Sequence, residues 1–176
     1  IGKSYEGREI FVLTVSDFKD GNAERKPGLW IDGNIHANEL QGSEIAMYTA
    51  WYLVENYHQV PFIKELLKDK VFYIAPTINP DSRDYFIYEP NTMHSSRTGR
   101  RPFDNDGDGL IAEDLYDDLD GDGHIVTMRR KSKTGRYKID PENPNRMVLA
   151  KPGEVGEYEL LGFEGIDNDG DGLVNE

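Results

Sequence analysis

The chain has 176 residues, enough for one domain with a substantial core. It carries 33 Asp and Glu against 20 Lys and Arg, a formal net charge of −13, which argues against nucleic acid or an anionic membrane surface as a partner. No apolar run approaches the roughly 18 residues that a transmembrane helix needs. Because cysteine is absent, disulfides, cysteine nucleophiles and thiolate metal sites are excluded.

The first part of the chain has the pattern of an α/β sheet. Residues 9–15 are rich in β-branched and aromatic side chains and predict one strand, and residues 28–32 and 71–75 predict two buried strands. A strand followed by helices and a second strand predicts a crossover in an α/β sheet.

Two helices are predicted between the second and third of these strands. A buried stripe at helical spacing is formed by Ala46, Ala50, Leu53 and Tyr57. Asn38 is placed to cap this helix, with Gln41 completing a capping box. A shorter helix is predicted from Pro61 to Leu67, since proline suits the first helical turn.

Regular periodicity fades after Asn79. Residues 124–130 and 136–139 predict a hairpin, and the rest of this region is predicted to be a long irregular insertion. We therefore expect residues 1–100 to form the regular α/β part of a domain and residues 101–176 to form an insertion within the same domain.

Three acidic repeats stand out in the predicted insertion. Residues 104–113 read DNDGDGLIAE, residues 167–176 read DNDGDGLVNE, and a copy without the final Glu, DLDGDGHI, begins at Asp118. Residues 104–122 contain nine acids and residues 164–176 contain five, with no Lys or Arg in either segment, so the remainder of the chain is close to neutral.

The repeats predict calcium loops. Alternate carboxylates can converge on one hard cation, and the glycine allows a sharp turn. An apolar residue follows at the eighth position of each copy (Ile111, Ile125 and Val174), as expected of a loop pinned to a core. Whether the ions are separate or shared is left open, and Asp114 and Asp117 are further candidates. The predicted calcium ligands are Asp104, Asp106, Asp108, Glu113, Asp118, Asp120, Asp122, Asp167, Asp169, Asp171 and Glu176.

His36 and Glu39 lie three residues apart, between a predicted strand and a predicted helix. Imidazole and carboxylate groups are good ligands for first-row metals, and strand ends are where open α/β folds place their sites. A surface His beside a helix-start Glu would give the same pattern. The other histidines, His58, His94 and His124, are poor candidates for a third ligand.

Two segments together carry a family resemblance. Residues 31–53, IDGNIHANELQGSEIAMYTAWYL, followed by residues 76–86, PTINPDSRDYF, resemble the zinc carboxypeptidase family, which has H-x-x-E after a strand and then an Asn-Pro-Asp-Gly turn. Ser82 stands here in place of that glycine. Bacterial members are also similar from Arg101 onward, in the RPFDNDGDG segment and the later repeats.

The resemblance implies a partial zinc-carboxypeptidase-like mixed sheet with helices, and a zinc-dependent peptidase acting at a free C-terminus. It implies zinc at His36 and Glu39, and a substrate-binding arginine, with Arg101 preferred and Arg97 and Arg100 as alternatives. The family's third zinc ligand and catalytic Glu lie later in the fold. The chain is therefore expected to be an internal fragment that is inactive alone, with the remainder of its own catalytic domain as a partner and no catalytic residue of its own.

Two other functions stay open from the residues: an aspartoacylase-like zinc deacylase, and a calcium-stabilised binding module without catalysis. Calcium loops of this kind favour an extracellular or periplasmic protein, where free calcium is high enough to fill them. The expected partners are peptide or protein substrates, with zinc and calcium as cofactors and with neither nucleic acid nor membrane.

Overall fold

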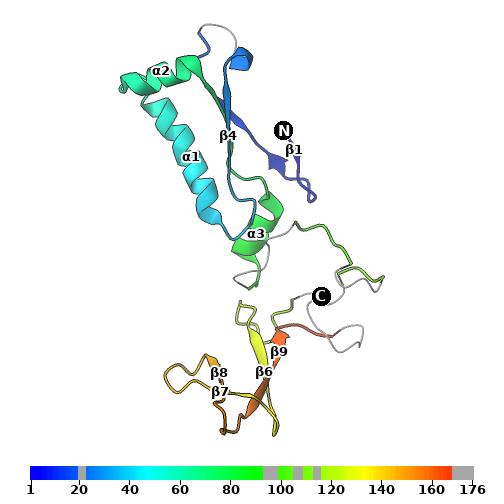
Figure 1. Cartoon of the computed structure of the whole chain (residues 1–176). Coiled ribbons are helices and arrows are strands. Elements are labelled where there is room, and N and C mark those ends of the chain that lie inside the picture. The colour runs from blue at the N-terminus through cyan, green and yellow to red at the C-terminus, as the bar shows by residue number, and fades with distance from the viewer. Residues whose placement is uncertain (20–22, 93–98, 105–108, 113–115, 168–176) are drawn as a thin grey trace. The chain divides into compact units, whose positions relative to one another are not determined.

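A computed structural model of the chain describes residues 1–19, 23–92, 99–104, 109–112 and 116–167. It contains two compact units. The first unit comprises Ile1–Glu89 and Met93–Arg101, and the second comprises Pro90–Thr92 and Pro102–Glu176. Figure 1 shows the elements of both units.

The first unit is built on a three-stranded mixed sheet in the order β3-β5-β4. Its strands are β3 (Leu13–Val15), β4 (Gly28–Asp32) and β5 (Val71–Ala75), and β5 pairs antiparallel with β3 and parallel with β4. The crossover from β4 to β5 contains α1 (Leu40–Glu55) and α2 (Pro61–Asp69), as the sequence predicts. A short 3₁₀ helix, η1 (Ala23–Arg25), precedes β4.

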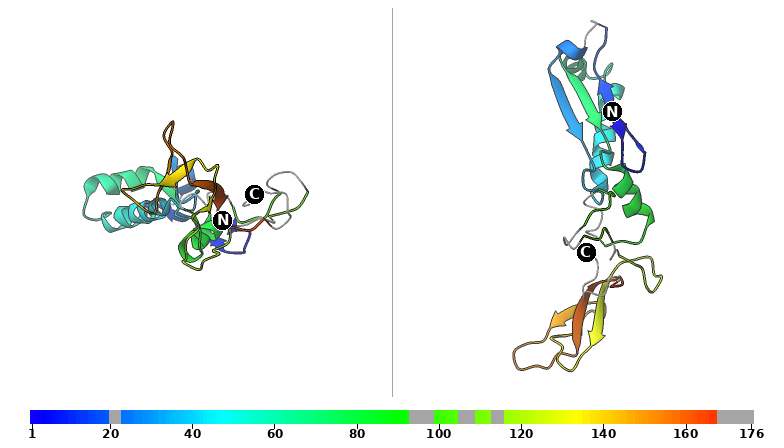
Figure 2. Two further views of the ribbon diagram at one scale, coloured as in Figure 1. Left: turned by 90° about the horizontal axis from the view of Figure 1, so that it is seen from below. Right: turned by 90° about the vertical axis from the view of Figure 1, so that its right-hand side faces the viewer.

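The core of the first unit lies between the sheet and its helices. Phe72 and Ile74, alternate residues of β5, lie in the same buried cluster as residues of α1 and α2. The ribbon in Figure 2 shows these two helices packed against one face of the sheet. The helices contribute the predicted residues Ala46, Ala50 and Leu53, together with Ile63 and Leu67. Tyr57 packs against this core from the turn after α1.

The predicted strand over residues 9–15 is wrong as a single element. β2 (Glu9–Ile10) pairs with β1 (Gly2–Lys3) in a separate two-stranded sheet, and only β3 joins β5. Gly7, with φ of +87°, makes the turn between β1 and β2. Apart from Glu9, residues 9–15 are all apolar or β-branched, so composition alone did not show that the chain changes sheets at residues 11–12.

Two further predictions in this unit fail. β4 is largely exposed rather than buried, because it pairs only with β5 among the described strands and leaves Leu29 and Trp30 open. The N-cap of α1 is Glu39 rather than Asn38, and no side-chain hydrogen bond caps this helix. The loop before α1 therefore ends one residue later than the capping box predicts.

A helix that the sequence pattern did not predict follows β5. α3 (Pro80–Tyr88) has Asn79 as its N-cap, and the Asn79 side chain accepts a hydrogen bond from the Ser82 N–H at 3.4 Å. Pro80 occupies the first turn, where its missing N–H costs nothing. Ser82 is buried within the helix, so the serine in place of the family's glycine is compatible with a helical turn.

The second unit contains a four-stranded sheet in the order β6-β9-β7-β8. Its strands are β6 (Thr127–Lys131), β7 (Tyr137–Ile139), β8 (Met147–Leu149) and β9 (Tyr158–Phe163). The predicted hairpin of residues 124–130 with 136–139 is wrong, because β9 lies between β6 and β7 and pairs with both. The insertion is thus not simply irregular: long-range antiparallel pairing orders it. No helix in the described residues is long and apolar enough to cross a membrane.

Candidate metal centre

The predicted zinc ligands lie in the loop between β4 and α1. His36 Nδ1 is 3.0 Å from Glu39 Oε1, and 36% and 55% of these two side chains are exposed, so both remain accessible to an ion. A tetrahedral zinc ion with bonds of about 2.0–2.1 Å holds two ligand atoms about 3.3 Å apart. The pair therefore has the donor types and the spacing that zinc requires, although the same distance also fits a direct hydrogen bond.

Two amide side chains hold this loop in place. Asn34, with φ of +57° and only 2% exposed, donates from Nδ2 to the carbonyl oxygens of His36 at 3.1 Å and Ala37 at 3.0 Å. From the other side, Asn79 Nδ2 donates to the Ile35 carbonyl at 3.1 Å. The backbone on each side of the His36 ring is thereby fixed by β4 and by the start of α3.

A close contact between two glycines packs the loop against α1. A Cβ atom on Gly33 would lie 2.4 Å from the Gly42 carbonyl oxygen, which no side chain tolerates. Next to it, the Ser43 and Thr77 hydroxyl oxygens are 2.8 Å apart. This packing places the first turn of α1, which begins just after Glu39, directly beside the end of β4.

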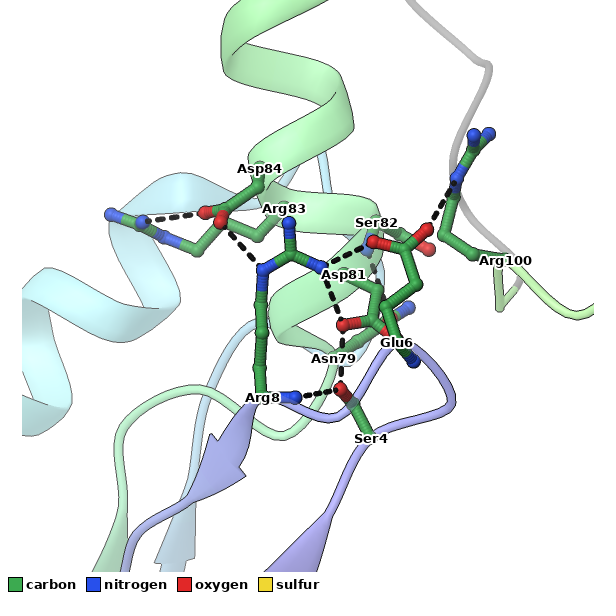
Figure 3. A network of polar contacts seen from close by, with 9 residues as sticks. All are labelled: Ser4, Glu6, Arg8, Asn79, Asp81, Ser82, Arg83, Asp84 and Arg100. Carbon is green, nitrogen blue, oxygen red and sulfur yellow. Dashed lines mark hydrogen bonds and ion pairs between the residues drawn. The ribbon is translucent and has the colours of Figure 1, made fainter.

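A polar network joins the start of α3 to the β1–β2 hairpin (Figure 3). Asp81, only 3% exposed, accepts hydrogen bonds from Ser4 Oγ at 2.6 Å, from the Glu6 N–H at 2.9 Å and from Arg8 at 2.9 Å. Arg8 also pairs with Asp84 at 2.9 Å and with Glu6. The Asn-Pro-Asp segment therefore supports the β4–α1 loop through Asn79 and the β1–β2 hairpin through Asp81.

The same network shifts the ionisation of two groups. Burial favours the neutral form of Asp81, but the hydrogen bonds from Ser4, Glu6 and Arg8 outweigh it and hold the pKa of Asp81 below its ordinary value. Hydrogen bonds to Glu6 and Asp81 raise the pKa of Arg8. Asp81 and Arg8 are therefore both charged at neutral pH.

The candidate substrate arginines differ in what they contact. Arg100 lies 3.5 Å from a Glu6 oxygen and 4.0 Å from the centre of the Tyr85 ring, so its guanidinium is engaged within the first unit. Arg101 is exposed and forms no ion pair with any described residue. Arg97 lies outside the described residues.

The acidic repeats are only partly described. Six predicted calcium ligands lie outside the described residues: Asp106, Asp108, Glu113, Asp169, Asp171 and Glu176. The further candidate Asp114, the apolar Val174 and the histidine His94 also lie outside them. In the first copy, Asp104 Oδ2 accepts a hydrogen bond from the Gly109 N–H at 3.1 Å, whereas Ile111 is 63% exposed and not pinned to a core as predicted. Ile125 of the second copy is buried, as predicted.

The second copy is described in full and forms a tight loop around Asp118. The Asp118 carboxylate accepts backbone hydrogen bonds from Gly121, Asp122 and Gly123 at 2.8 to 3.1 Å. Carboxylate oxygens of Asp118, Asp120 and Glu164 lie within 4.8 Å of one another. Glu164 was not predicted as a ligand, because it is 44 residues from Asp120 and outside every repeat. Asp122 is not part of this group, and Asp117 is exposed.

Comparison with known proteins identifies the family. The family model described as zinc carboxypeptidase matches residues 1–124. Carboxypeptidase A4 of Mus musculus is 33% identical over 102 residues, covering 58% of this chain and 23% of that protein. Carboxypeptidase Z of Rattus norvegicus is 32% identical over 140 residues, covering 79% of this chain and 21% of that protein.

Among solved structures, the crystal structure of thrombin activatable fibrinolysis inhibitor matches with a TM-score of 0.51 and 26% identity, over 65% of this chain and 28% of that one. The chain thus spans about a quarter of the length of these relatives. The match over residues 1–124 includes the β4–α1 loop with its H-x-x-E pair and the Asn-Pro-Asp start of α3. The chain belongs to the zinc carboxypeptidase family.

Proposed function

We propose that the protein containing this chain is a zinc-dependent metallocarboxypeptidase that hydrolyses the last peptide bond of peptides or proteins. The observation that carries the proposal is the convergence of His36 Nδ1 and Glu39 Oε1, 3.0 Å apart, in a loop fixed at the end of β4. Family membership supplies the reaction class, and the loop supplies the place where this chain would take part in it.

His36 and Glu39 would hold the zinc ion. Asn34 and Asn79 would fix the backbone of their loop through hydrogen bonds to its carbonyl oxygens. When bound, zinc lowers the pKa of its water to about 7 and polarises a carbonyl. In the described residues, no third His, Asp or Glu completes a group of three with this pair. From the family's pattern, in which the third ligand and the catalytic Glu lie later in the fold, we propose that the 176 residues alone do not hydrolyse peptides.

An arginine would bind the carboxylate at the substrate's C-terminus, because a guanidinium can form two parallel hydrogen bonds with it. We favour Arg101 over Arg100. Arg100 is already engaged with Glu6 and Tyr85, whereas Arg101 is exposed and has no ion pair among the described residues. Arg97 remains the alternative.

We further propose that the remainder of the catalytic domain covers the apolar surface of α1. The rings of Tyr48 and Trp51 lie 5.3 Å apart and those of Tyr48 and Tyr52 lie 6.1 Å apart, and all three side chains are exposed. Large contiguous apolar surfaces of this kind mark contact sites. The 176-residue chain should bind the dye ANS more strongly, per molecule, than the full-length protein; equal binding would contradict this proposal.

The acidic repeats would bind calcium and stabilise the second unit. Their oxygen ligands suit a hard cation, and such loops in extracellular modules bind calcium at about 10⁻⁴–10⁻³ M. An extracellular or periplasmic location follows from this range of concentrations.

The zinc assignment is tested by metal content. The purified chain is equilibrated with zinc and calcium, dialysed, and analysed by inductively coupled plasma spectrometry. His36→Ala should lose the zinc and keep the calcium. His58→Ala is the matched control, because it removes the same side chain from an exposed position outside the β4–α1 loop. His58 lies after α1, where its ring packs edge-on against the Tyr57 ring. Equal zinc content in wild type and His36→Ala would show that the ligands lie elsewhere.

The reaction class is tested on the full-length protein. With zinc and calcium supplied, a blocked dipeptide with a free C-terminal carboxylate should be hydrolysed and its C-terminal amide should not, and Arg101→Ala should raise KM for the free acid. Hydrolysis of N-acyl amino acids in preference to peptides would contradict the peptidase assignment.

A further inference from the structure

The second acidic repeat lacks the glutamate that ends the other two copies. Residue 127, where that Glu would fall, is the threonine that begins β6. The fold brings a different carboxylate to this loop. Glu164 follows β9 directly, and one of its oxygens lies within 4.8 Å of carboxylate oxygens of both Asp118 and Asp120.

Backbone pairing on both sides fixes the position of Glu164. Its N–H donates to the Val126 carbonyl at 2.8 Å, and its carbonyl accepts from the Asp117 N–H at 3.1 Å. Tyr116 and Gly165 form a β-bridge beside it. The side chain thus points into the loop because residues 116–117 and 126 hold the backbone of Glu164 between them.

The carboxylate of Glu164 is buried and only half satisfied. The residue is 4% exposed, and Oε1 accepts from the N–H groups of Leu119 at 2.8 Å and Asp120 at 3.2 Å. Oε2 is buried and has no hydrogen-bond partner among the described residues. No described Lys, Arg or His forms an ion pair with Glu164, Asp118 or Asp120. A buried carboxylate oxygen without a partner is costly unless a cation or a proton neutralises it.

We infer that Glu164 is a calcium ligand that completes the site of the second repeat together with Asp118 and Asp120. Oxygens bound to one calcium ion at about 2.3–2.6 Å lie up to about 5 Å apart, which the spacing of these three carboxylates allows. Three carboxylates around a divalent ion are a hard, all-oxygen donor set. The ion would satisfy Glu164 Oε2 and join the end of β9 to the loop that precedes β6.

This inference deepens the calcium proposal for the repeats and is independent of peptidase activity. Its test compares wild type with Glu164→Gln, a change that keeps an oxygen able to accept from Leu119 and Asp120 but removes the charge. The control is Glu157→Gln, the same change at an exposed residue just before β9. Calcium binding is measured by titration against a chromophoric chelator, and thermal unfolding is followed by circular dichroism with calcium and with EDTA.

Glu164→Gln should lose one calcium equivalent or weaken its binding at least about tenfold, whereas Glu157→Gln should match wild type. The sign of the stability change should reverse. In calcium, Glu164→Gln should melt below wild type; in EDTA it should melt at or above wild type, because a buried unpaired charge has been removed. Asp120→Asn, an exposed change that leaves Glu164 in place, should also weaken calcium binding.

The outcomes separate the two proposals. If wild type binds no calcium, both the calcium proposal and the assignment of Glu164 fail. If wild type binds calcium and Glu164→Gln binds it with the same stoichiometry and affinity, the assignment of Glu164 alone fails. An equal loss of melting temperature with and without calcium would show that Glu164 has only a packing role.

Discussion

The polar network at the start of α3 makes a prediction whose size follows from the hydrogen bonds present. Asp81→Asn keeps the shape of the side chain but turns one of its two oxygens into an N–H₂ donor. One oxygen of Asp81 faces Ser4 Oγ and Arg8, and the other faces the Glu6 N–H, so either orientation of the amide puts a donor against a donor. The substitution therefore loses at least one hydrogen bond to a buried carboxylate.

A hydrogen bond to a charged group contributes about 1.5–3 kcal/mol, and leaving a buried donor unpaired costs a similar amount. Arg8 is 38% exposed and keeps its contacts with Asp84 and Glu6, so solvent screening and these partners limit the loss. We expect Asp81→Asn to lower the free energy of unfolding of the first unit by about 2–3 kcal/mol. Asp84→Asn, the matched change at a half-exposed partner of Arg8, should cost no more than about 1 kcal/mol.

The assay is urea unfolding followed by tryptophan fluorescence. Trp30 and Trp51, the two tryptophans of the chain, both lie in the first unit, in β4 and α1, so the signal reports on that unit alone. The Glu6 amide, which donates to Asp81, should also exchange its hydrogen faster in Asp81→Asn. Equal unfolding midpoints for Asp81→Asn and Asp84→Asn would refute the prediction that the buried carboxylate contributes more to stability than the more exposed one.

The pH dependence has a definite sign. Folding lowers the pKa of Asp81 below its ordinary 3.8, so its ionised form stabilises the fold above that pH, and this contribution is lost as the pH falls through the lower folded-state value. The gap in stability between wild type and Asp81→Asn should thus be full at neutral pH and narrow below about pH 4. A gap of the same size in acid would contradict the role of the charge.

Three further predictions concern packing and metal. Gly33→Ala should unfold more easily by about 1–3 kcal/mol, because its Cβ would meet the Gly42 carbonyl, whereas Gly2→Ala, in open space, should be neutral by the same urea assay. Leu53→Ala should cost about 2–5 kcal/mol in that assay, since Leu53 is in the core between α1 and the sheet, against about 0.5 or less for exposed Ile45→Ala. In zinc-free chain loaded with calcium, EDTA should lower the melting temperature of the second unit by several degrees in circular dichroism and leave the tryptophan transition in place; an unchanged melt would count against calcium.

How far the fold was predictable depended on how local its determinants are. The helix from Leu40 to Glu55 has a local pattern of buried residues at helical spacing, and the strand from Val71 to Ala75 is a local run of apolar residues. Both were therefore predicted from sequence. α3 was missed because its nine residues are only weakly amphipathic. Its N-cap Asn79 and first two residues also form an Asn-Pro-Asp segment, which suits a turn equally well. The order of the second sheet was missed because β9 pairs with β7 across 21 residues and with β6 across 27 residues or more, and no local pattern encodes that pairing.

The two candidate metal sites show the same division. His36 and Glu39 lie three residues apart, so one loop brings them to within 3.0 Å, and the sequence pattern was sufficient to nominate both. The roles of Asn34 and Asn79 in fixing the β4–α1 loop were not predicted. Their hydrogen bonds to backbone carbonyls depend on how β4 and α3 come together. Sequence spacing thus identified the candidate ligands but not what holds them.

The second acidic repeat differs from the other two in a way that matters for folding. In the first and third repeats a Glu lies five residues after the last Asp, at Glu113 and Glu176, within the same short segment. The second repeat obtains Glu164 only after β9 has docked beside β6. Because binding to a site that exists only in the folded state adds its free energy to folding, calcium here would stabilise the long-range pairing itself. The strand that no local pattern predicts is therefore the one that the proposed ion would hold in place.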